Sequence, residues 1–159
     1  MVDLRASLAP GARLLGLDLG SKTVGLALTD VGLMLATPAP SLKRDKLGKM
    51  AAALSPFIAA NGVGGLVVGL PLSMDGTRGP AAQAAADWAK DLSERLSLPA
   101  ALWDERLSTA AVTRAMIQEG DLTRKKRAAA VDSAAAAWML QGALDASRPA
   151  PLPGSHRPA

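Results

Sequence analysis

The chain has 159 residues, of which 49% are hydrophobic and 20% charged, so it can form one folded domain with a core and is not a disordered polymer. Its net charge of +4 suits a polyanionic partner, whereas aromatic residues make up only 3%, which argues against a stacking platform for single-stranded bases. There is no cysteine, and the single histidine, His156, lies in a proline-rich tail. Disulfides, thiol nucleophiles and histidine-based catalysis are therefore excluded, and any chemistry at neutral pH must depend on carboxylates and a hard metal ion.

The ends of the chain carry no targeting signal in this interpretation. No basic start followed by an apolar run is present, and no apolar segment approaches the roughly 20 residues that span a bilayer. We expect a soluble, cytoplasmic protein without a membrane partner. Residues 1–12 are predicted to be a disordered extension, residues 13–147 a single domain, and residues 148–159 a disordered proline-rich tail.

Residues 14–30 predict two short strands joined by a turn at 20–22, because apolar residues alternate on either side of a Gly/Ser turn. Leu15 and Leu17 share one face of the first strand, and Gly16 and Asp18 share the other. A carboxylate on a face of small residues leaves space for a backbone, a phosphate or a metal ion. Alternatively, Asp18 is an ordinary charge on an edge strand.

The other segments predict alternating strands and helices. We expect a turn at 30–32 in which Asp30 has a purely local role, and a third strand over 33–37 that ends at Pro38 and Pro40. The remaining predicted elements are a helix over 43–60 closed by Asn61-Gly62 (with a kink or a later start because of Pro56), a buried parallel strand over 65–70, a ligand-binding loop over 71–80, a helix over 81–96, a strand over 100–105, a helix over about 108–119 capped by Ser108 or Thr109, a loop over 120–127, and a helix over 128–146. This order indicates an α/β fold: a mixed five-stranded sheet, three strands antiparallel and then parallel strands, with helices on both faces.

Carboxylates stand at three unusual places in this pattern. Asp18 lies within an apolar strand, Asp104 and Glu105 end the fifth strand, and Asp132 interrupts an alanine-rich helix. Asp104 and Glu105 point to opposite faces if the strand continues, so one of them faces the site. Asp132 is either a buried metal ligand or the N-cap of a helix that starts at Ser133. Three carboxylates from separate segments are what a Mg²⁺ or Mn²⁺ site requires, and two such ions roughly 4 Å apart can catalyse phosphodiester cleavage.

Four segments taken together resemble the YqgF/RuvX family of pre-16S rRNA nucleases and Holliday junction resolvases. The segments are Gly16-Leu17-Asp18-Leu19-Gly20-Ser21-Lys22, Val68-Gly69-Leu70-Pro71-Leu72-Ser73-Met74-Asp75-Gly76-Thr77, Asp104-Glu105-Arg106-Leu107-Ser108-Thr109, and Arg124-Lys125-Lys126 with Val131-Asp132-Ser133-Ala134-Ala135. The resemblance implies an RNase H-like fold and a metal-dependent nuclease that acts on precursor rRNA or branched DNA. It implies Asp18, Glu105 and Asp132 as the catalytic and metal-binding residues, with Asp104 in reserve. Asp18 would be shared by two Mg²⁺ or Mn²⁺ ions.

The same resemblance implies contacts to the phosphate backbone from the basic residues Lys22, Arg78, Arg106, Arg124, Lys125, Lys126 and Arg127. For Arg78 and for the cluster at 124–127, a solvated surface loop is the alternative. Thr23 departs from the family pattern, which often has a second basic residue at this place. The partners implied are nucleic acid and the precursor of the small ribosomal subunit, for a monomer or a homodimer.

Two other functions remain open at this point. Sugar kinases and actin-like ATPases also begin with an Asp-x-Gly-Ser/Thr loop, but they need two such domains and this chain has one Asp-x-Gly of that kind. A non-catalytic RNA-binding ribosome-assembly factor could use the same fold without cleaving anything. Such a factor would bind RNA without metal and with a strong salt dependence.

Overall fold

The computed structural model describes residues 2–20, 22–71, 79–104 and 124–147, with the backbone alone for residues 2 and 124–133. In chain order these residues form α1 (Val2–Ser7), β1 (Arg13–Leu19), β2 (Thr23–Thr29), β3 (Ala36–Lys43), α2 (Leu47–Asn61), β4 (Val63–Leu70), α3 (Pro80–Leu96), β5 (Ala100–Asp104) and α5 (Arg124–Ala146). None of the helices in these ranges is long and apolar enough to cross a bilayer.

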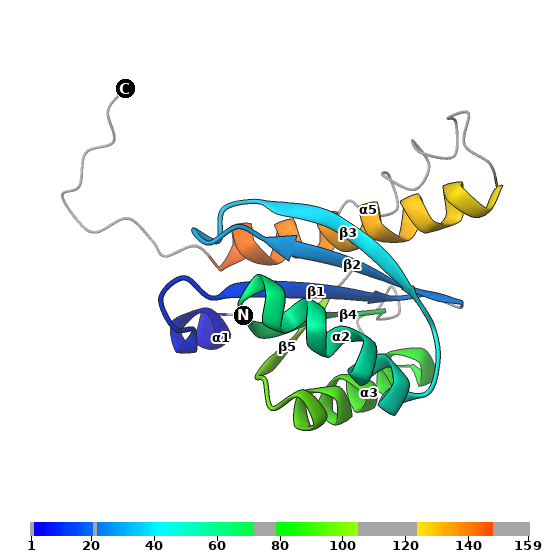
Figure 1. Cartoon of the computed structure of the whole chain (residues 1–159), viewed down its shortest axis with the longest axis horizontal. Helices are drawn as coiled ribbons and strands as arrows, with labels where there is room; N and C mark the ends of the chain where they lie inside the picture. The colour runs from blue at the N-terminus through cyan, green and yellow to red at the C-terminus, as the bar shows by residue number, and fades with distance from the viewer. Residues whose placement is uncertain (1, 21, 72–78, 105–123, 148–159) are drawn as a thin grey trace.

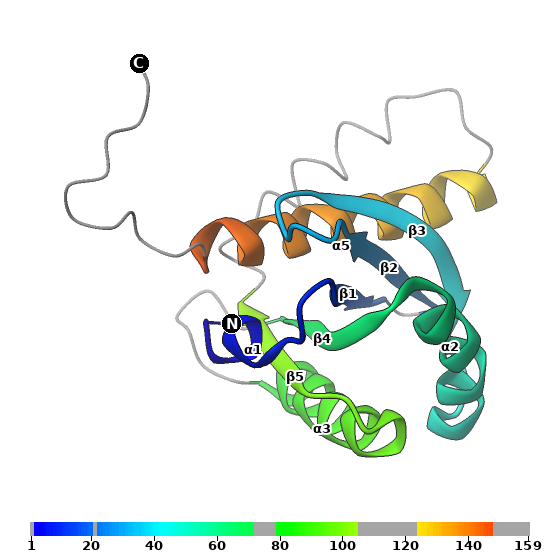
Figure 2. The same ribbon diagram turned by 60° about the vertical axis from the view of Figure 1, so that its left-hand side comes forward.

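The five strands form one sheet in the order β3-β2-β1-β4-β5. β2 is antiparallel to both β1 and β3, whereas β4 is parallel to both β1 and β5. Helix α5 covers one face of the sheet, and α2 and α3 lie on the other (Figures 1 and 2). The predicted fold class, a mixed sheet with helices on both faces, is confirmed.

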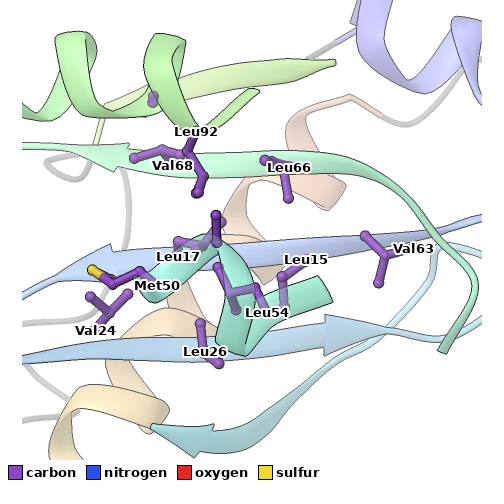
Figure 3. Packing of buried hydrophobic residues seen from close by; sticks show 12 residues of the cluster. Leu15, Leu17, Val24, Leu26, Met50, Leu54, Val63, Leu66, Val68 and Leu92 are labelled. Atoms are coloured by element: carbon purple, nitrogen blue, oxygen red, sulfur yellow. The ribbon is translucent and has the colours of Figure 1, made fainter. Parts of the chain in front are cut away.

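Large aliphatic side chains fill the face under α2 and α3. Leu15 and Leu17 of β1 point to this face, because side chains alternate along a strand. They pack with Met50 and Leu54 of α2 and Leu92 of α3 (Figure 3). The alternation predicted for the first hairpin is therefore the one that builds this core.

On the opposite face, under α5 and α1, alanines pack beside larger aliphatic residues. Leu14 and Val67 pack there with Ala136 and Leu140 of α5. Helix and strand approach closely, since a Cβ added to Gly16 would lie 3.1 Å from the Cβ of Leu140. The absence of a side chain at Gly16 lets α5 rest directly on β1.

The third strand differs from its prediction. β3 runs from Ala36 to Lys43 and includes Pro38 and Pro40, so the prolines do not end it. The physical reason is that β3 is an edge strand, where a residue without an N–H can point its nitrogen away from β2 without breaking the ladder. The N–H of Ala36 is used outside the ladder too, as a donor to Oε1 of Gln141 in α5 at 2.9 Å.

The turn before β3 is confirmed as the place of Asp30. Its carboxylate Oδ1 accepts hydrogen bonds from the backbone N–H of Leu35 at 3.0 Å and of Met34 at 2.7 Å. These bonds, that of Leu35 first, hold the pKa of the exposed Asp30 carboxyl below its ordinary value. Asp30 thus has the local structural role that the sequence indicates.

The amino-terminal segment is ordered where a disordered extension over residues 1–12 was predicted. It forms helix α1, whose Leu4 is buried in the core under α5. The Arg5 guanidinium donates hydrogen bonds to the carbonyl oxygens of Leu144 at 3.2 Å and Leu33 at 3.3 Å. The positive charge of Arg5 at the carboxyl end of α5 also interacts favourably with the helix dipole. The segment is held by tertiary partners that no local pattern reveals.

The helices agree with prediction except at their starts. α2 begins at Leu47, later than predicted, and contains Pro56. It ends at Asn61 and is capped by Gly62, whose left-handed φ of 62° lets its N–H bond to the carbonyl of Ile58. α5 begins at Arg124, so the predicted loop over 120–127 is wrong for the basic cluster. The helix predicted over 108–119 and the tail at 148–159 lie outside the described residues.

Candidate functional site

Asp18 lies near the carboxyl end of β1, paired across the ladder with Gly25 of β2. By strand alternation it shares the α5 face with Gly16, and it is only 4% exposed. Burying a carboxylate is costly unless hydrogen bonds or a cation compensate for the lost water. Its ladder partner Gly25 and the preceding residue on its face, Gly16, carry no side chain beyond Cα.

The direction of α5 can be followed from its contacts with β3. Gln141 bonds to Ala36 at the start of β3, whereas Ala134 borders a groove with Pro38 further along that strand. β3 is parallel to β1 through two antiparallel pairings, so α5 runs antiparallel to β1 and its amino-terminal half lies toward the carboxyl end of β1.

This direction brings the position of Asp132 toward the end of β1 that carries Asp18. Asp132, Ala136 and Leu140 are spaced four residues apart, so they follow one side of the helix, and Leu140 lies against Gly16. The alternative that Asp132 is the N-cap of a helix starting at Ser133 is wrong, because α5 begins at Arg124. The side chain of Asp132 is not among those that the structure describes.

Strand β5 places its residues on alternating faces. Ala100 and Leu102 line a groove with α3, whereas Ala101 and Trp103 pack against the core under α5. Asp104 continues the first set, and its ladder partner Leu70 packs with α3 residues. The structure thus places Asp104, the reserve candidate, on the face opposite to Asp18, while Glu105 lies outside the described residues.

Trp103 is a site residue that the sequence analysis did not identify. It pairs with Gly69 of β4, and the β1–β4 register, which matches Leu17 with Val68, sets Asp18 alongside the same Gly69. Trp103 and Asp18 are on one face of the sheet, and Gly69, the residue between them in the ladder, has no side chain. Within the described part of the chain, the indole Nε1 of Trp103 is buried and has no hydrogen-bond partner. An aromatic residue directly before an acidic pair is the only signal in the sequence.

Two basic residues meet at the turn beyond Asp18. Lys22 is exposed in this turn, as expected for a phosphate contact. Arg44, which the sequence analysis did not single out, donates through its Nη1 to the carbonyl oxygen of Gly20 at 2.8 Å. The backbone N–H of Arg44 also bonds to the carbonyl of Lys22 at 2.9 Å. Arg44 is therefore bound to the backbone of the turn that carries Lys22 and follows Asp18.

The basic cluster at 124–127 forms the beginning of α5, whose first turn contains no acidic residue. Positive side chains near the amino end of a helix oppose the helix dipole by about 0.3–1 kcal/mol each. The helix dipole therefore gives no reason for basic residues at these positions. Arg78 and Arg106 lie outside the described residues.

The described residues do not include a complete set of metal ligands. Among the residues with described side chains, no group of three or more His, Cys, Asp or Glu could hold a metal ion. Of Asp18, Glu105 and Asp132, only Asp18 has a described side chain, as does the reserve candidate Asp104. The donors available to the domain are carboxylates, which are the ligands that Mg²⁺ and Mn²⁺ prefer.

Comparison with known proteins identifies the family. A family model described as "RuvX: Holliday junction resolvase" matches residues 12–146. A protein of Gluconobacter oxydans named "Putative pre-16S rRNA nuclease" is 61% identical over 147 residues, covering 92% of either chain. A protein of the same name from Gluconacetobacter diazotrophicus is 60% identical, over 92% of this chain and 96% of its own.

The fold is also that of a solved structure. The chain superimposes on RuvC of T. thermophilus in complex with a Holliday junction substrate with a TM-score of 0.52, covering 85% of this chain and 94% of RuvC. Because only 14% of the residues are identical, the likeness shows the fold alone. It confirms the RNase H-like architecture that the resemblance implied.

Proposed function

The chain belongs to the RuvX family, and from this premise we propose that it is a divalent-metal-dependent nuclease that hydrolyses phosphodiester bonds at the 5′ end of pre-16S rRNA. The observation that carries the proposal is the place of Asp18, buried on the α5 face near the carboxyl end of β1. The direction of α5 supports it, since position 132 lies toward that same end.

In this proposal Asp18, Glu105 and Asp132 would hold one or two Mg²⁺ or Mn²⁺ ions. Such ions, when bound, stabilise the charge on the reacting phosphate and lower the pKa of a coordinated water. The face assignments support Glu105 over Asp104, because Asp104 lies with the residues that face α3. The chain holds no cysteine and no histidine other than His156, so the carboxylates also have to orient the attacking water.

The basic residues position the nucleic acid in this proposal. Lys22 and Arg44 stand at the turn after Asp18, and the cluster at 124–127 begins the helix that carries Asp132. Together with Arg78 and Arg106 they would bind backbone phosphates and set the register of the substrate without reading its sequence.

The names of the relatives support precursor rRNA as the substrate. The cytoplasm as the place of the reaction, and the precursor of the small ribosomal subunit as the partner, are further parts of this proposal. The description of the family model supports branched DNA as the second candidate. The net charge of +4 suits either polyanion. The choice therefore depends on a direct assay.

The test is cleavage of a labelled RNA containing the 5′ end of 16S rRNA and its leader, and of a four-way DNA junction, each in Mg²⁺, Mn²⁺ or EDTA. Asp18→Asn, Glu105→Gln and Asp132→Asn should each lower the rate by more than about 100-fold, because each removes an interaction worth several kcal/mol in the transition state. Asp104→Asn is the matched control and should retain cleavage.

Metal-dependent cleavage of one substrate, lost in the three variants and kept in Asp104→Asn, would support the proposal and identify the substrate. If the wild type binds RNA without metal and cleaves neither substrate, the protein is a binding factor on a nuclease fold. If Asp104→Asn is inactive and Glu105→Gln is not, the assignment of the third carboxylate is wrong.

A further inference from the structure

The indole N–H of Trp103 is a buried donor that the described fold does not use. Its Nε1 is buried and has no hydrogen-bond partner among the described residues, while the ring packs against the core under α5. Leaving such a donor unsatisfied destabilises the folded protein, because the bond that it makes to water in the unfolded chain is lost. A phenylalanine could fill an apolar site on this strand without that cost, so packing alone does not explain a tryptophan here.

The place of Trp103 in the sheet shows where an acceptor would come from. Trp103 is paired with Gly69, and Asp18 stands alongside Gly69 on its other side, on the same face. Neighbouring strands are about 4.8 Å apart, so the two Cα atoms are separated by about 10 Å, a gap that a tryptophan and an aspartate side chain span from its two sides. Gly69 contributes no side chain to this gap.

The other polar groups buried on this face have protein partners. The hydroxyl of Thr29 accepts a hydrogen bond from the backbone N–H of Leu14 at 2.9 Å, and the hydroxyl of Ser147 donates to the carbonyl of Ala143 at 2.8 Å. Trp103 is the exception among the described residues, and it is also the one next to the acidic site. An acceptor that arrives with the metal or the substrate accounts for both facts.

The geometry points to Trp103 as a positioning residue whose indole N–H donates a hydrogen bond to an oxyanion at the Asp18 site. This inference rests on the proposed function, because the oxyanion is either a carboxylate that turns to hold a divalent ion or a phosphate oxygen of the nucleic acid. Partners outside the first coordination sphere that orient metal-binding carboxylates contribute about 10–100-fold in metal affinity or activity. Trp103 would orient the oxyanion through its hydrogen bond and would not contact the metal ion itself.

The first test is the ¹H–¹⁵N NMR signal of the Trp103 indole, assigned with a Trp103→Phe variant. The full-length protein is titrated with Mg²⁺ alone and then with Ca²⁺ and the 16S leader RNA, Ca²⁺ being used to slow hydrolysis. A downfield shift of the Trp103 proton in Mg²⁺ alone supports a carboxylate acceptor, and a shift only with RNA supports a phosphate acceptor. Trp88, which packs on the opposite face, is the internal control and should not shift.

The second test replaces Trp103 with benzothienylalanine, which keeps the shape of the ring and exchanges the N–H for sulfur. Mn²⁺ affinity, measured by calorimetry, or the cleavage rate in saturating Mn²⁺ should fall about 10–100-fold, while the melting temperature should stay equal or rise because an unsatisfied donor is removed. The same replacement at Trp88 should change neither the affinity nor the rate.

The outcomes separate the inference from the proposed function. If Mn²⁺ binds in an Asp18-dependent manner but the Trp103 signal does not move and the replacement has no effect, the inference fails and the nuclease proposal stands. If Mn²⁺ does not bind and no substrate is cleaved, both fail. A replacement that lowers the melting temperature and leaves affinity and rate unchanged would assign Trp103 a purely structural role.

Discussion

The two faces of the sheet are built from side chains of different size. Under α2 and α3, strands and helices contribute mainly leucine, methionine and valine. Under α5, glycine and alanine are frequent, and the buried polar groups lie on this side or at its margin: Asp18, Thr29, Ser147 and the Nε1 of Trp103.

The face under α2 and α3 mainly stabilises the fold, whereas the face under α5 carries the candidate site. Large side chains exclude water and hold two layers about 10 Å apart, whereas small ones let a helix backbone approach a strand and leave space for polar groups. At Gly16 the approach is so close that a Cβ would be 3.1 Å from Leu140. The missing side chain of Gly16 thus lets α5 lie close to β1, the strand that carries Asp18. Four substitutions test this distinction.

Leu17→Ala should have the largest effect on stability and a small direct effect on the site. Leu17 is 0% exposed and packs under α2 and α3, so its truncation should lower the free energy of unfolding by about 2–5 kcal/mol. Leu102→Ala, at a position 36% exposed on the same face, is the control and should cost clearly less. Urea unfolding measures both, and equal losses would contradict the core assignment.

Gly16→Val should disturb the α5 face instead. Its Cβ and two methyl groups would meet the side chain of Leu140, with an expected cost of about 1–3 kcal/mol for overpacking. Because α5 would have to move away from β1, metal affinity should fall further than this loss of stability explains. Gly16→Ala, which asks for a shift of a few tenths of an ångström, should have an intermediate effect. A variant with normal metal affinity would show that the close contact does not position the site.

Much of this fold could be predicted from local patterns. The alternation of leucine with glycine and Asp18 in β1 identified both faces of the central strand, and the apolar run in β4 identified a strand buried on both sides. The turn at Asp30 and the helix end at Gly62 follow from the chemistry of single residues. These features depend on neighbours in the chain.

The features that could not be predicted depend on tertiary neighbours. Pro38 is compatible with β3 only because β3 is at the edge of the sheet, and Leu4 folds onto the domain only because α5 covers it. In the site, the sequence indicated that Asp104 and Glu105 face opposite ways, but which of them shares a face with Asp18 depends on the register between β4 and β5. The lack of a hydrogen-bond partner for the indole N–H of Trp103 among the described residues likewise depends on tertiary packing.

Thr29→Val should test whether the polar groups of the α5 face need their partners. The Thr29 hydroxyl accepts from the buried backbone N–H of Leu14 at 2.9 Å, near the irregularity where the β1–β4 register shifts. Valine keeps the shape of the side chain and leaves that N–H unsatisfied, so the free energy of unfolding should fall by about 1–3 kcal/mol. Thr29→Ser keeps the acceptor and should lose less. If the Leu14 amide exchanges its hydrogen faster in Thr29→Val but not in Thr29→Ser, the loss of stability arises at this hydrogen bond. If Thr29→Val is as stable as the wild type, the prediction is wrong.

Asp30→Ala should have the smallest effect, because Asp30 is exposed in the β2–β3 turn and belongs to neither core. The N–H groups of Leu35 and Met34 lower the pKa of its carboxyl in the folded state. A carboxyl whose pKa is lower in the folded than in the unfolded chain stabilises the fold above the unfolded pKa, and this contribution disappears as the pH falls through the folded value. The wild type should thus be more stable than Asp30→Ala at neutral pH, and the difference should vanish as the pH falls below about 4. Thermal unfolding across this range measures it, with Asp30→Asn as the control that keeps an acceptor but cannot titrate. A difference that is independent of pH would mean that the hydrogen bonds of the turn do not depend on the charge of Asp30.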